Sequence, residues 1–440
     1  MQNILKISLI TIFCTVFFAC QKKTIEIRIN FSNLAERYVV LQLQMGNIDK
    51  EYVDAYFGPL KYKQMADSNK ISLTEIRLAA DSLLFELKKY NENFFNPLWK
   101  VRYRYIKKEL YALLARVAIV EGNRKAFNTE SNEIFNVIAP FVTDEEAEKV
   151  LKNLDALLPG EGTLQERFEE FHKGFIVPKE FVPILFRMAL EELRRKTKLY
   201  IQLPSSEKFD LEFVNDKPWG AYNWYKGYFN SHIQINTDLP MYLDRVLDLT
   251  CHEAYPGHHV YHSSIEKIIV RDSGWVECSV YPLYSPQSVV SEGLANYAVE
   301  LAFTKEERIE FEKKLCDVAD MNSEKVERLH RVLKGVKKLE PFSNEVVRRY
   351  YDKVINKVQA VELLMKYTLR TQAQAEKFLS FVDNYGSYTV TYSEGYNLVK
   401  NYMARMGVTE ENTHYRWLLY KELLSGPFLP SDLLKDKLKD

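Results

Sequence analysis

Glycine and proline, the residues that most often interrupt regular structure, are scarce in this chain. Its 440 residues include only 16 Gly and 15 Pro, which is below the usual shares of about 7% and about 5%. An all-β protein needs many tight turns, and such turns depend on these two residues. The sequence therefore predicts a mainly α-helical protein.

The apolar residues support this prediction because they recur at helical spacing over most of the chain. The first run has intervals of four, three and four residues between Leu34, Tyr38, Leu41 and Met45. Similar runs cover residues 72–92, 97–121, 144–158, 179–198, 288–303, most of 305–382, and 396–425. We expect packed antiparallel helices in an N-terminal helical region at 33–205 and a second region at 206–440. The two regions are either separate domains or one continuous domain.

The stretch between residues 209 and 236 departs from the helical pattern. Six aromatic residues crowd around Gly220 and Gly227, and residues 232–236 then alternate between polar and apolar side chains. We expect a small β-element here and no other. A strand at Ile233–Asn236 would either bind an extended peptide along a free edge or belong to a structural hairpin.

The charge balance excludes nucleic acid as a partner. The chain has 60 Lys and Arg residues against 60 Asp and Glu residues, so its formal net charge is zero. No block of like charges forms a basic arm. A nucleic-acid binder depends on a concentration of positive charge, which this sequence lacks.

The first 19 residues have the pattern of a signal peptide. Lys6 and the amino terminus are positive, and residues 7–19 form an apolar stretch that is too short to span a membrane as a mature helix. The stretch ends in a small residue followed by Cys20, which resembles a bacterial lipobox. We therefore predict a signal peptide at 1–19, a lipid anchor and tether at 20–32, and export to the periplasmic or outer-membrane side of a bacterial membrane. Plain secretion is the alternative.

The remaining cysteines do not form a recognisable site. Beyond the signal peptide and Cys20, the chain has Cys251, Cys278 and Cys316. An odd number of cysteines without a CxxC spacing argues against a disulfide framework and against a cysteine zinc site. We expect buried free thiols.

Four of the eight histidines lie within eleven residues, at positions 252, 258, 259 and 262. The segment begins with His252-Glu253, as does the HExxH zinc helix, in which two His one turn apart bind the metal and the Glu acts as general base. The fourth residue after His252, however, is Pro256. On an unbroken helix neither His258 nor His259 would lie close enough to share a metal with His252.

Pro256 resolves this difficulty because proline breaks a helix, and Gly257 permits the backbone change needed to restart one. An excursion of two residues would bring His258 to the position of the second ligand. His259 would require an excursion of three residues and remains the alternative. The histidine of this pair that does not bind the metal would then lie behind the site or in the wall of its pocket.

A site with two His ligands needs a third protein ligand and an open position for water. Glu292, in the segment Ser291–Tyr297, is the best candidate downstream. The apolar stripe of this predicted helix leaves Glu292 and Asn296 together on another face. The amide of Asn296 could accept the N–H of a ligand His and fix its tautomer.

These motifs carry a resemblance to a known family. His-Glu-x-x-Pro-Gly-His-His followed by Glu-Gly-x-Ala-x-Tyr resembles the bacterial family called domain of unknown function 885, which is grouped with zincin-like metallopeptidases. One subgroup is also similar in three further segments, Tyr52–Pro59, Pro218–Trp224 and Ile233–Pro240. Leu294 departs from the Trp that is usual in the family, which affects the expected shape of the pocket.

The resemblance implies a largely helical, gluzincin-like scaffold and a hydrolase. It implies His252, His258 and Glu292 as zinc ligands and Glu253 as general base, and it supplies no substrate. The segment Tyr388–Gly395 is similar to a late Tyr-x-x-Gly of the family. From it we expect the hydroxyl of Tyr392 to stabilise the oxyanion of a tetrahedral intermediate.

The sequence thus predicts a lipid-anchored zinc hydrolase that cleaves a peptide or another amide. Two alternatives remain: a catalytically silent metal-binding or scaffolding lipoprotein, and a zinc amidase with a non-peptide substrate. A protein that only binds metal has no need of Glu253, so this residue separates the first alternative from an enzyme. The oligomeric state stays open. The other histidines, at 172, 232, 262, 330 and 414, are expected in core or surface roles.

We predict that Cys20 is acylated in the mature protein. Mass spectrometry of the amino terminus should find a lipid on this residue, and Cys20→Ser should move the protein out of the membrane fraction because one residue carries the anchor. An unmodified terminus that begins elsewhere would instead indicate plain secretion.

Overall fold

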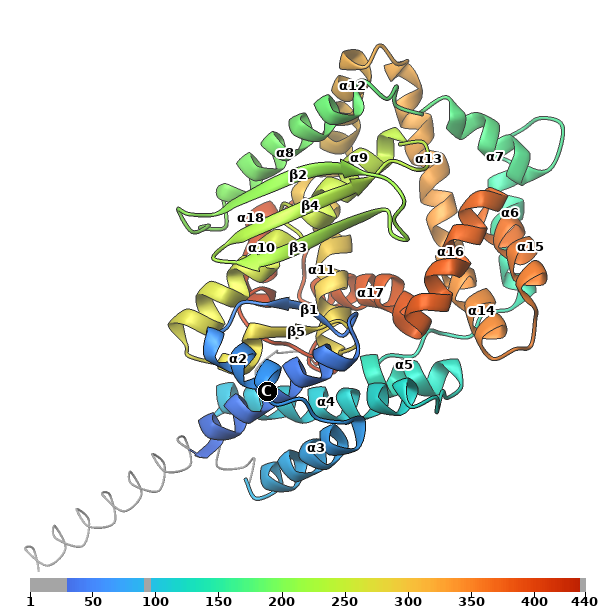
Figure 1. Cartoon of the computed structure of the whole chain (residues 1–440). Coiled ribbons are helices and arrows are strands. Elements are labelled where there is room, and N and C mark those ends of the chain that lie inside the picture. Colours follow the sequence, from blue (N-terminus) through green and yellow to red (C-terminus); the bar gives the residue numbers. More distant parts are fainter. Residues whose placement is uncertain (1–29, 91–95, 436–440) are drawn as a thin grey trace, which may run out of the picture.

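The computed structural model describes residues 30–90 and 96–435 (Figure 1). The predicted signal peptide and the predicted acylation site at Cys20 lie outside these residues. Helices make up most of the described chain, which confirms the expected mainly α fold. No helix in the described part is long and apolar enough to cross a membrane.

The first helix of the described residues covers 30–48, so residues 30–32, which we expected in the tether, are helical. The α-helices that follow are α2 (Leu60–Ser68), α3 (Leu73–Leu87), α4 (Pro97–Val120), α5 (Phe127–Phe135), α6 (Asp144–Asp155), α7 (Leu164–Lys173), α8 (Val182–Lys198), α9 (Leu243–Glu253), α10 (His258–Ser264), α11 (Pro286–Ala302), α12 (Lys305–Val318), α13 (Val326–Val336), α14 (Glu340–Tyr351), α15 (Lys357–Thr368), α16 (Gln372–Tyr385), α17 (Val390–Arg405) and α18 (Thr413–Leu423). A π-helix at Ile265–Asp272 extends α10. Short 3₁₀ turns lie at Val276–Ser279, Ser323–Lys325, Lys337–Leu339 and Gly386–Thr389.

Several helices begin at a capping box, which joins the residue before the helix to the residue three positions later. The side chain of each accepts a hydrogen bond from the backbone N–H of the other. Ser72 with Glu75 starts α3, and Thr304 with Glu307 starts α12. The same arrangement starts α6, α7, α15 and α16. Among these helices, α3, α6 and α12 begin within one residue of the predicted helical runs, whereas α7 lies outside all of them.

The predicted β-element is a three-stranded sheet in the order β2 (Lys208–Val214), β4 (Asn230–Asn236), β3 (Ala221–Gly227). β2 runs parallel to β4, and β3 runs antiparallel to it. β4 is therefore the central strand, with both edges paired. The hypothesis that a strand at Ile233–Asn236 binds a peptide along a free edge is wrong for this reason.

A second sheet was not predicted. β1 (Val53–Tyr56) pairs antiparallel with β5 (Val280–Pro282), and Ala55 lies opposite Tyr281. The two strands have four and three residues, too few for an alternating pattern to be recognised. The pairing is also non-local, so no turn signal in the sequence announces it.

One apolar core contains buried residues from both regions of the sequence, including Leu34, Leu193, Leu247 and Val399. α11 lies at its centre, and nearly all of its residues are buried. In Figure 1 this helix stands between the three-stranded sheet and α17. Cys251, Cys278 and Cys316 are buried free thiols, as expected.

Two glycines allow α11 and α17 to approach each other at backbone distance. A Cβ atom at Gly293 of α11 would lie 2.3 Å from the carbonyl oxygen of Gly395 of α17. A Cβ atom at Gly395 would lie 2.3 Å from the carbonyl oxygen of Val289. No side chain fits between the two helices here, and this contact places α17 directly beside Glu292.

We predict that Gly293→Ala destabilises the protein. Overpacking typically costs about 1–3 kcal/mol, occasionally more, and two buried backbones cannot separate without opening the core. This cost should exceed the gain of at most about 1 kcal/mol in helix propensity. The matched control is Gly174→Ala, where the nearest atom to a Cβ would be 3.4 Å away. Equal free energies of unfolding for the two variants in denaturant titrations would contradict the proposed close contact.

Candidate metal centre

A break between two helices brings the first two candidate ligands together. His252 lies in the last turn of α9, and His258 is the first residue of α10. Between them, the N–H of Gly257 donates to the carbonyl oxygen of Cys251 at 2.9 Å. A Cβ atom at position 257 would lie 2.0 Å from the carbonyl oxygen of His252. The break expected from Pro256 and Gly257 is therefore present, and only glycine fits at its second position.

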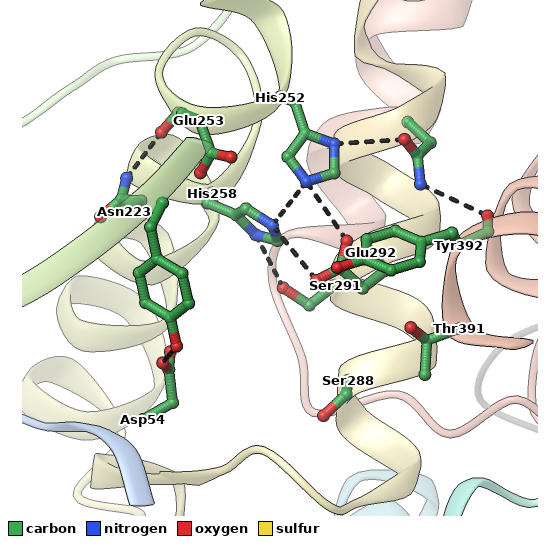
Figure 2. Close-up of polar contacts among 12 residues, drawn as sticks. Asp54, Asn223, His252, Glu253, His258, Ser288, Ser291, Glu292, Thr391 and Tyr392 are labelled. Carbon is green, nitrogen blue, oxygen red and sulfur yellow. Dashed lines mark hydrogen bonds and ion pairs between the residues drawn. The ribbon is translucent and has the colours of Figure 1, made fainter. Parts of the chain in front are cut away.

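The structure brings His252, His258 and Glu292 to one point (Figure 2). The Nε2 atoms of the two imidazoles are 3.1 Å apart. Glu292 Oε2 lies 3.2 Å from His252 Nε2, and Glu292 Oε1 lies 3.6 Å from His258 Nε2. The three residues come from three different helices, α9, α10 and α11.

The protons on the imidazoles follow from the groups behind them. Asn296 donates its Nδ2–H to the carbonyl oxygen of Tyr392 at 3.3 Å, which leaves its Oδ1 3.2 Å from His252 Nδ1. An amide oxygen only accepts, so Nδ1 of His252 carries the proton and the Nε2 of the neutral ring presents a lone pair. On the other ring, His258 Nδ1 lies 3.2 Å from Ser291 Oγ, which can accept in the same way.

Glu292 is held in place on one side only. Tyr388 donates its hydroxyl to Glu292 Oε1 at 2.8 Å. The other oxygen, Oε2, is buried and makes no hydrogen bond, although it lies near His252. Buried carboxylate oxygens normally have a partner, so the orphaned Oε2 indicates that a cation belongs at this point.

The electrostatics of the cluster favour positive charge. Burial raises the pKa of Glu292, but the neighbouring His258 and His252 outweigh it and lower the pKa well below its usual value. Burial lowers the pKa of His258, but Glu292 outweighs that effect and raises it to about 9. A carboxylate between two imidazoles thus stabilises a cation at the position that all three residues face.

The residues fit a zinc ion. Bonds of about 2.0–2.2 Å at tetrahedral angles place ligand atoms about 3.3–3.6 Å apart. The observed separations of 3.1, 3.2 and 3.6 Å are close to that range. Two imidazole nitrogens and one carboxylate oxygen also form a donor set that catalytic zinc uses, with a fourth position left open. This group could therefore hold a metal ion.

His259 does not belong to this group. Its ring is fully buried, with Nδ1 2.7 Å from Ser231 Oγ of β4 and Nε2 3.2 Å from Glu207. It thus packs α10 against the three-stranded sheet and faces away from His252. The other histidines, His172, His232, His262, His330 and His414, also lie outside the group.

Glu253 lies beside the convergence point and has no competing partner. Its backbone carbonyl accepts a hydrogen bond from Asn223 at 2.6 Å, whereas its carboxylate makes no hydrogen bond or ion pair with any residue of the described chain. In Figure 2 this carboxylate points toward His252 and His258. Burial raises its pKa, and the two imidazoles partly offset that effect.

Tyr392 lies on α17, which the Gly293–Gly395 contact holds against α11. Its ring centroid is 6.5 Å from that of His252, and the side chain is 36% exposed. Although part of the ring is exposed, desolvation of the hydroxyl by the residues around it, together with Glu292 and Glu253, raises the pKa of this hydroxyl well above 10, so it stays protonated and can donate.

Two cavities meet at the centre. A groove of about 1130 Å³ and a smaller cavity of about 70 Å³ are both lined by His252, Glu253 and Tyr392. The proposed ligand Glu292 lines only the smaller one. The groove therefore borders His252 and Glu253, and Glu292 lies on the side of the small cavity.

Sequence reasoning missed four residues of the site: Asp54, Tyr222, Ser291 and Tyr388. Asp54 and Tyr222 lie in segments that resemble the family, but neither segment has a spacing that assigns chemistry. Tyr388 lies one turn before Tyr392, and only the packing of the helices shows which tyrosine faces Glu292.

The comparisons with known proteins give distant similarities of fold. No protein-family model matches the chain, and no curated protein matches it in sequence. A candidate lipoprotein from Colwellia psychrerythraea is 14% identical, with a TM-score of 0.45 over 83% of this chain and 71% of that chain. A candidate lipoprotein of unknown function from Shewanella oneidensis is 12% identical, with a TM-score of 0.41 over 82% of this chain and 76% of that chain.

An M32 carboxypeptidase from Deinococcus radiodurans R1 is also 12% identical, with a TM-score of 0.41 over 93% of this chain and 95% of that chain. Similarities at this level carry no argument about function. The resemblance to the domain of unknown function 885 family therefore stays a prediction, and the function must be argued from the site.

We predict that His258→Ala and His259→Gln affect zinc binding differently. Removal of a ligand should weaken binding by more than about 100-fold, since changes behind the ligands alone cost about 10–100-fold. Gln at position 259 removes no ligand and should retain one zinc per chain. Metal analysis after dialysis measures both, with circular dichroism to confirm folding. Loss of zinc from the 259 variant alone would contradict the assignment.

Proposed function

We propose that this protein is a zinc-dependent hydrolase of amide bonds, most simply a metallopeptidase, with His252, His258 and Glu292 as ligands. One observation carries the proposal. Three ligand atoms converge beside a carboxylate, that of Glu253, which has no partner of its own and faces the junction of two cavities. The arrangement supports a reaction as well as metal binding.

Each of the remaining residues has a part in such a reaction. Bound zinc would supply Lewis acidity toward the scissile carbonyl and lower the pKa of water. Glu253 would accept a proton from the attacking water and pass it to the nitrogen of the leaving amine. The hydroxyl of Tyr392 would donate a hydrogen bond to the oxygen of the tetrahedral intermediate.

The residues behind the ligands would hold this geometry. Asn296 orients His252, Ser291 contacts His258, and Tyr388 holds one oxygen of Glu292. Such contacts fix the tautomer and the angle of each ligand before metal arrives. The groove beside these residues has room for an amide substrate.

A catalytically silent metal-binding lipoprotein is the alternative from another class. It would account for the ligands but not for Glu253, because a buried carboxylate without a partner lowers stability and contributes no ligand. A zinc amidase with a non-peptide substrate uses the same chemistry, and assays with both kinds of amide separate it from a peptidase. As a further part of the proposal, a lipid on Cys20 attaches the enzyme to the exported face of a bacterial membrane.

We predict that Glu253→Gln reduces hydrolysis by about 100-fold or more, since it removes the general base, and leaves zinc content and folding unchanged. The assay is turnover of a peptide library with and without chelator. The control is Glu310→Gln, at an exposed position of α12, which should keep full activity. Turnover by the Glu253 variant equal to that of the unmodified protein would leave a metal-binding role for the site and exclude this mechanism.

A further inference from the structure

The small cavity at the proposed centre contains a carboxylate that the hydrolytic reaction does not use. Its 70 Å³ are lined by three acidic residues, Asp54, Glu253 and Glu292, and by no Lys or Arg. Glu292 faces the imidazoles, and Glu253 is the proposed base. Asp54 remains without a role.

Asp54 is held by a hydrogen bond, and no described residue forms an ion pair with it. It lies on β1, which packs beside β3, and its carboxylate accepts a hydrogen bond from the hydroxyl of Tyr222 on β3. Within residues 30–90 and 96–435, no Lys, Arg or His lies within ion-pair distance of it. A half-buried carboxylate without an ion-pair partner is unfavourable in a folded protein. A ligand that brings a positive charge would remove this cost.

The position of Asp54 indicates which positively charged group of a ligand would lie beside it. The small cavity and the large groove share their walls at the centre, through His252, Glu253 and Tyr392. A substrate whose scissile carbonyl lies at the centre therefore has little room on the Asp54 side and much room on the other. A cavity needs at least about 10–15 Å³ for each water molecule, so the small side accommodates about five atoms of that size. This is about the size of one small amino-acid residue with a free amino group.

Resting on the proposed function, we propose that Asp54 binds the free α-ammonium group of a peptide, so that the enzyme is an aminopeptidase. The first residue of the peptide occupies the small cavity, and the rest extends along the groove. The oxygen of water forms a bond to the carbonyl carbon of the first residue. The C–N bond to the second residue breaks, and Glu253 transfers the proton from water to the released amine. The products are one free amino acid and a peptide shortened by one residue.

Burial raises the pKa of Asp54 to about 6, with smaller contributions from Glu292 and Glu253, although the Tyr222 hydroxyl and His258 oppose this effect. The carboxylate is thus ionised at neutral pH, at which an α-ammonium is largely protonated. Tyr281, Tyr385 and Tyr388 line the same cavity, so the surroundings of the carboxylate are partly aromatic. A charge pair in such surroundings contributes more than one on the surface.

The experiment measures binding of tetra-alanine to the zinc-loaded, full-length Glu253→Gln variant, in which turnover is suppressed. Isothermal titration calorimetry compares three forms of the peptide: unmodified, N-acetylated and C-terminally amidated. We expect N-acetylation to weaken binding by about 30-fold or more, as loss of one partner of a buried ion pair does. Amidation should change the affinity by less than about 3-fold. On the unmodified enzyme, chromatography should detect alanine and tri-alanine as the first products.

A second variant assigns the effect to one residue. Adding Asp54→Asn should weaken binding of the unmodified peptide to the level of the acetylated one, with zinc content unchanged. The control is Asp67→Asn on α2, at an exposed position, which should alter neither. Tyr222→Phe keeps the carboxylate and should retain the preference for a free amine, which excludes a general loss of structure as the cause.

Equal binding of the acetylated and unmodified peptides would overturn the inference, as would loss of binding on amidation alone, because the site would then recognise another part of the peptide. Failure of all three peptides to bind would also overturn it. These results are distinguishable from failure of the proposed function, which would appear as absence of bound zinc or as full turnover by Glu253→Gln.

Discussion

The contact between Gly257 and the end of α9 is the constraint on which the centre depends. An uninterrupted helix would place His258 on the wrong face, because six residues turn it about 240° away from His252. The N–H of Gly257 instead returns to the carbonyl of Cys251, and the backbone lies so close to His252 that no Cβ fits. The chain thus starts a new helix with His258 next to His252. The proximity of the two imidazoles is a consequence of this backbone contact.

The second requirement is the packing of α11 and α17. Gly293 and Gly395 remove the side chains that would separate the two helices. The residues beside these glycines are then the ones that reach the centre: Glu292 from α11, and Tyr388 and Tyr392 from the segment before Gly395. Each glycine therefore lies close to a residue of the centre, both in the sequence and in the structure. The close packing of the two helices explains how the site can be held rigidly by helices rather than by a loop.

The sequence predicted the helical class and the ligand group for a local reason. Helical periodicity and the Pro256–Gly257 break are both signals within a few residues. Glu292 could be found because its helix has one apolar stripe and a polar face. Only the structure shows that Glu292 lies close to His252 and His258. The role of the three residues as ligands stays a prediction.

Non-local contacts could not be predicted in this way. The pairing of β1 with β5 joins segments more than half the chain apart, and it places Asp54 beside the centre. The central position of β4 depends on a parallel partner, β2, that no turn identifies. Likewise, the sequence does not show which of Tyr388 and Tyr392 contacts Glu292. In the structure Tyr388 makes this contact, and Tyr392 lines the groove.

X-ray absorption spectroscopy of the zinc-loaded protein tests the central claim most directly, because it reports the atoms that surround the metal without any assumption about a substrate. The account predicts two imidazole ligands and oxygen ligands, all at about 2.0–2.2 Å, with no sulfur. Cys251 precedes His252 in sequence but is buried in the core, and burial raises the pKa of its thiol, which disfavours the thiolate. A sulfur shell at about 2.3 Å, or a spectrum without imidazole scattering, would contradict the His252–His258–Glu292 centre.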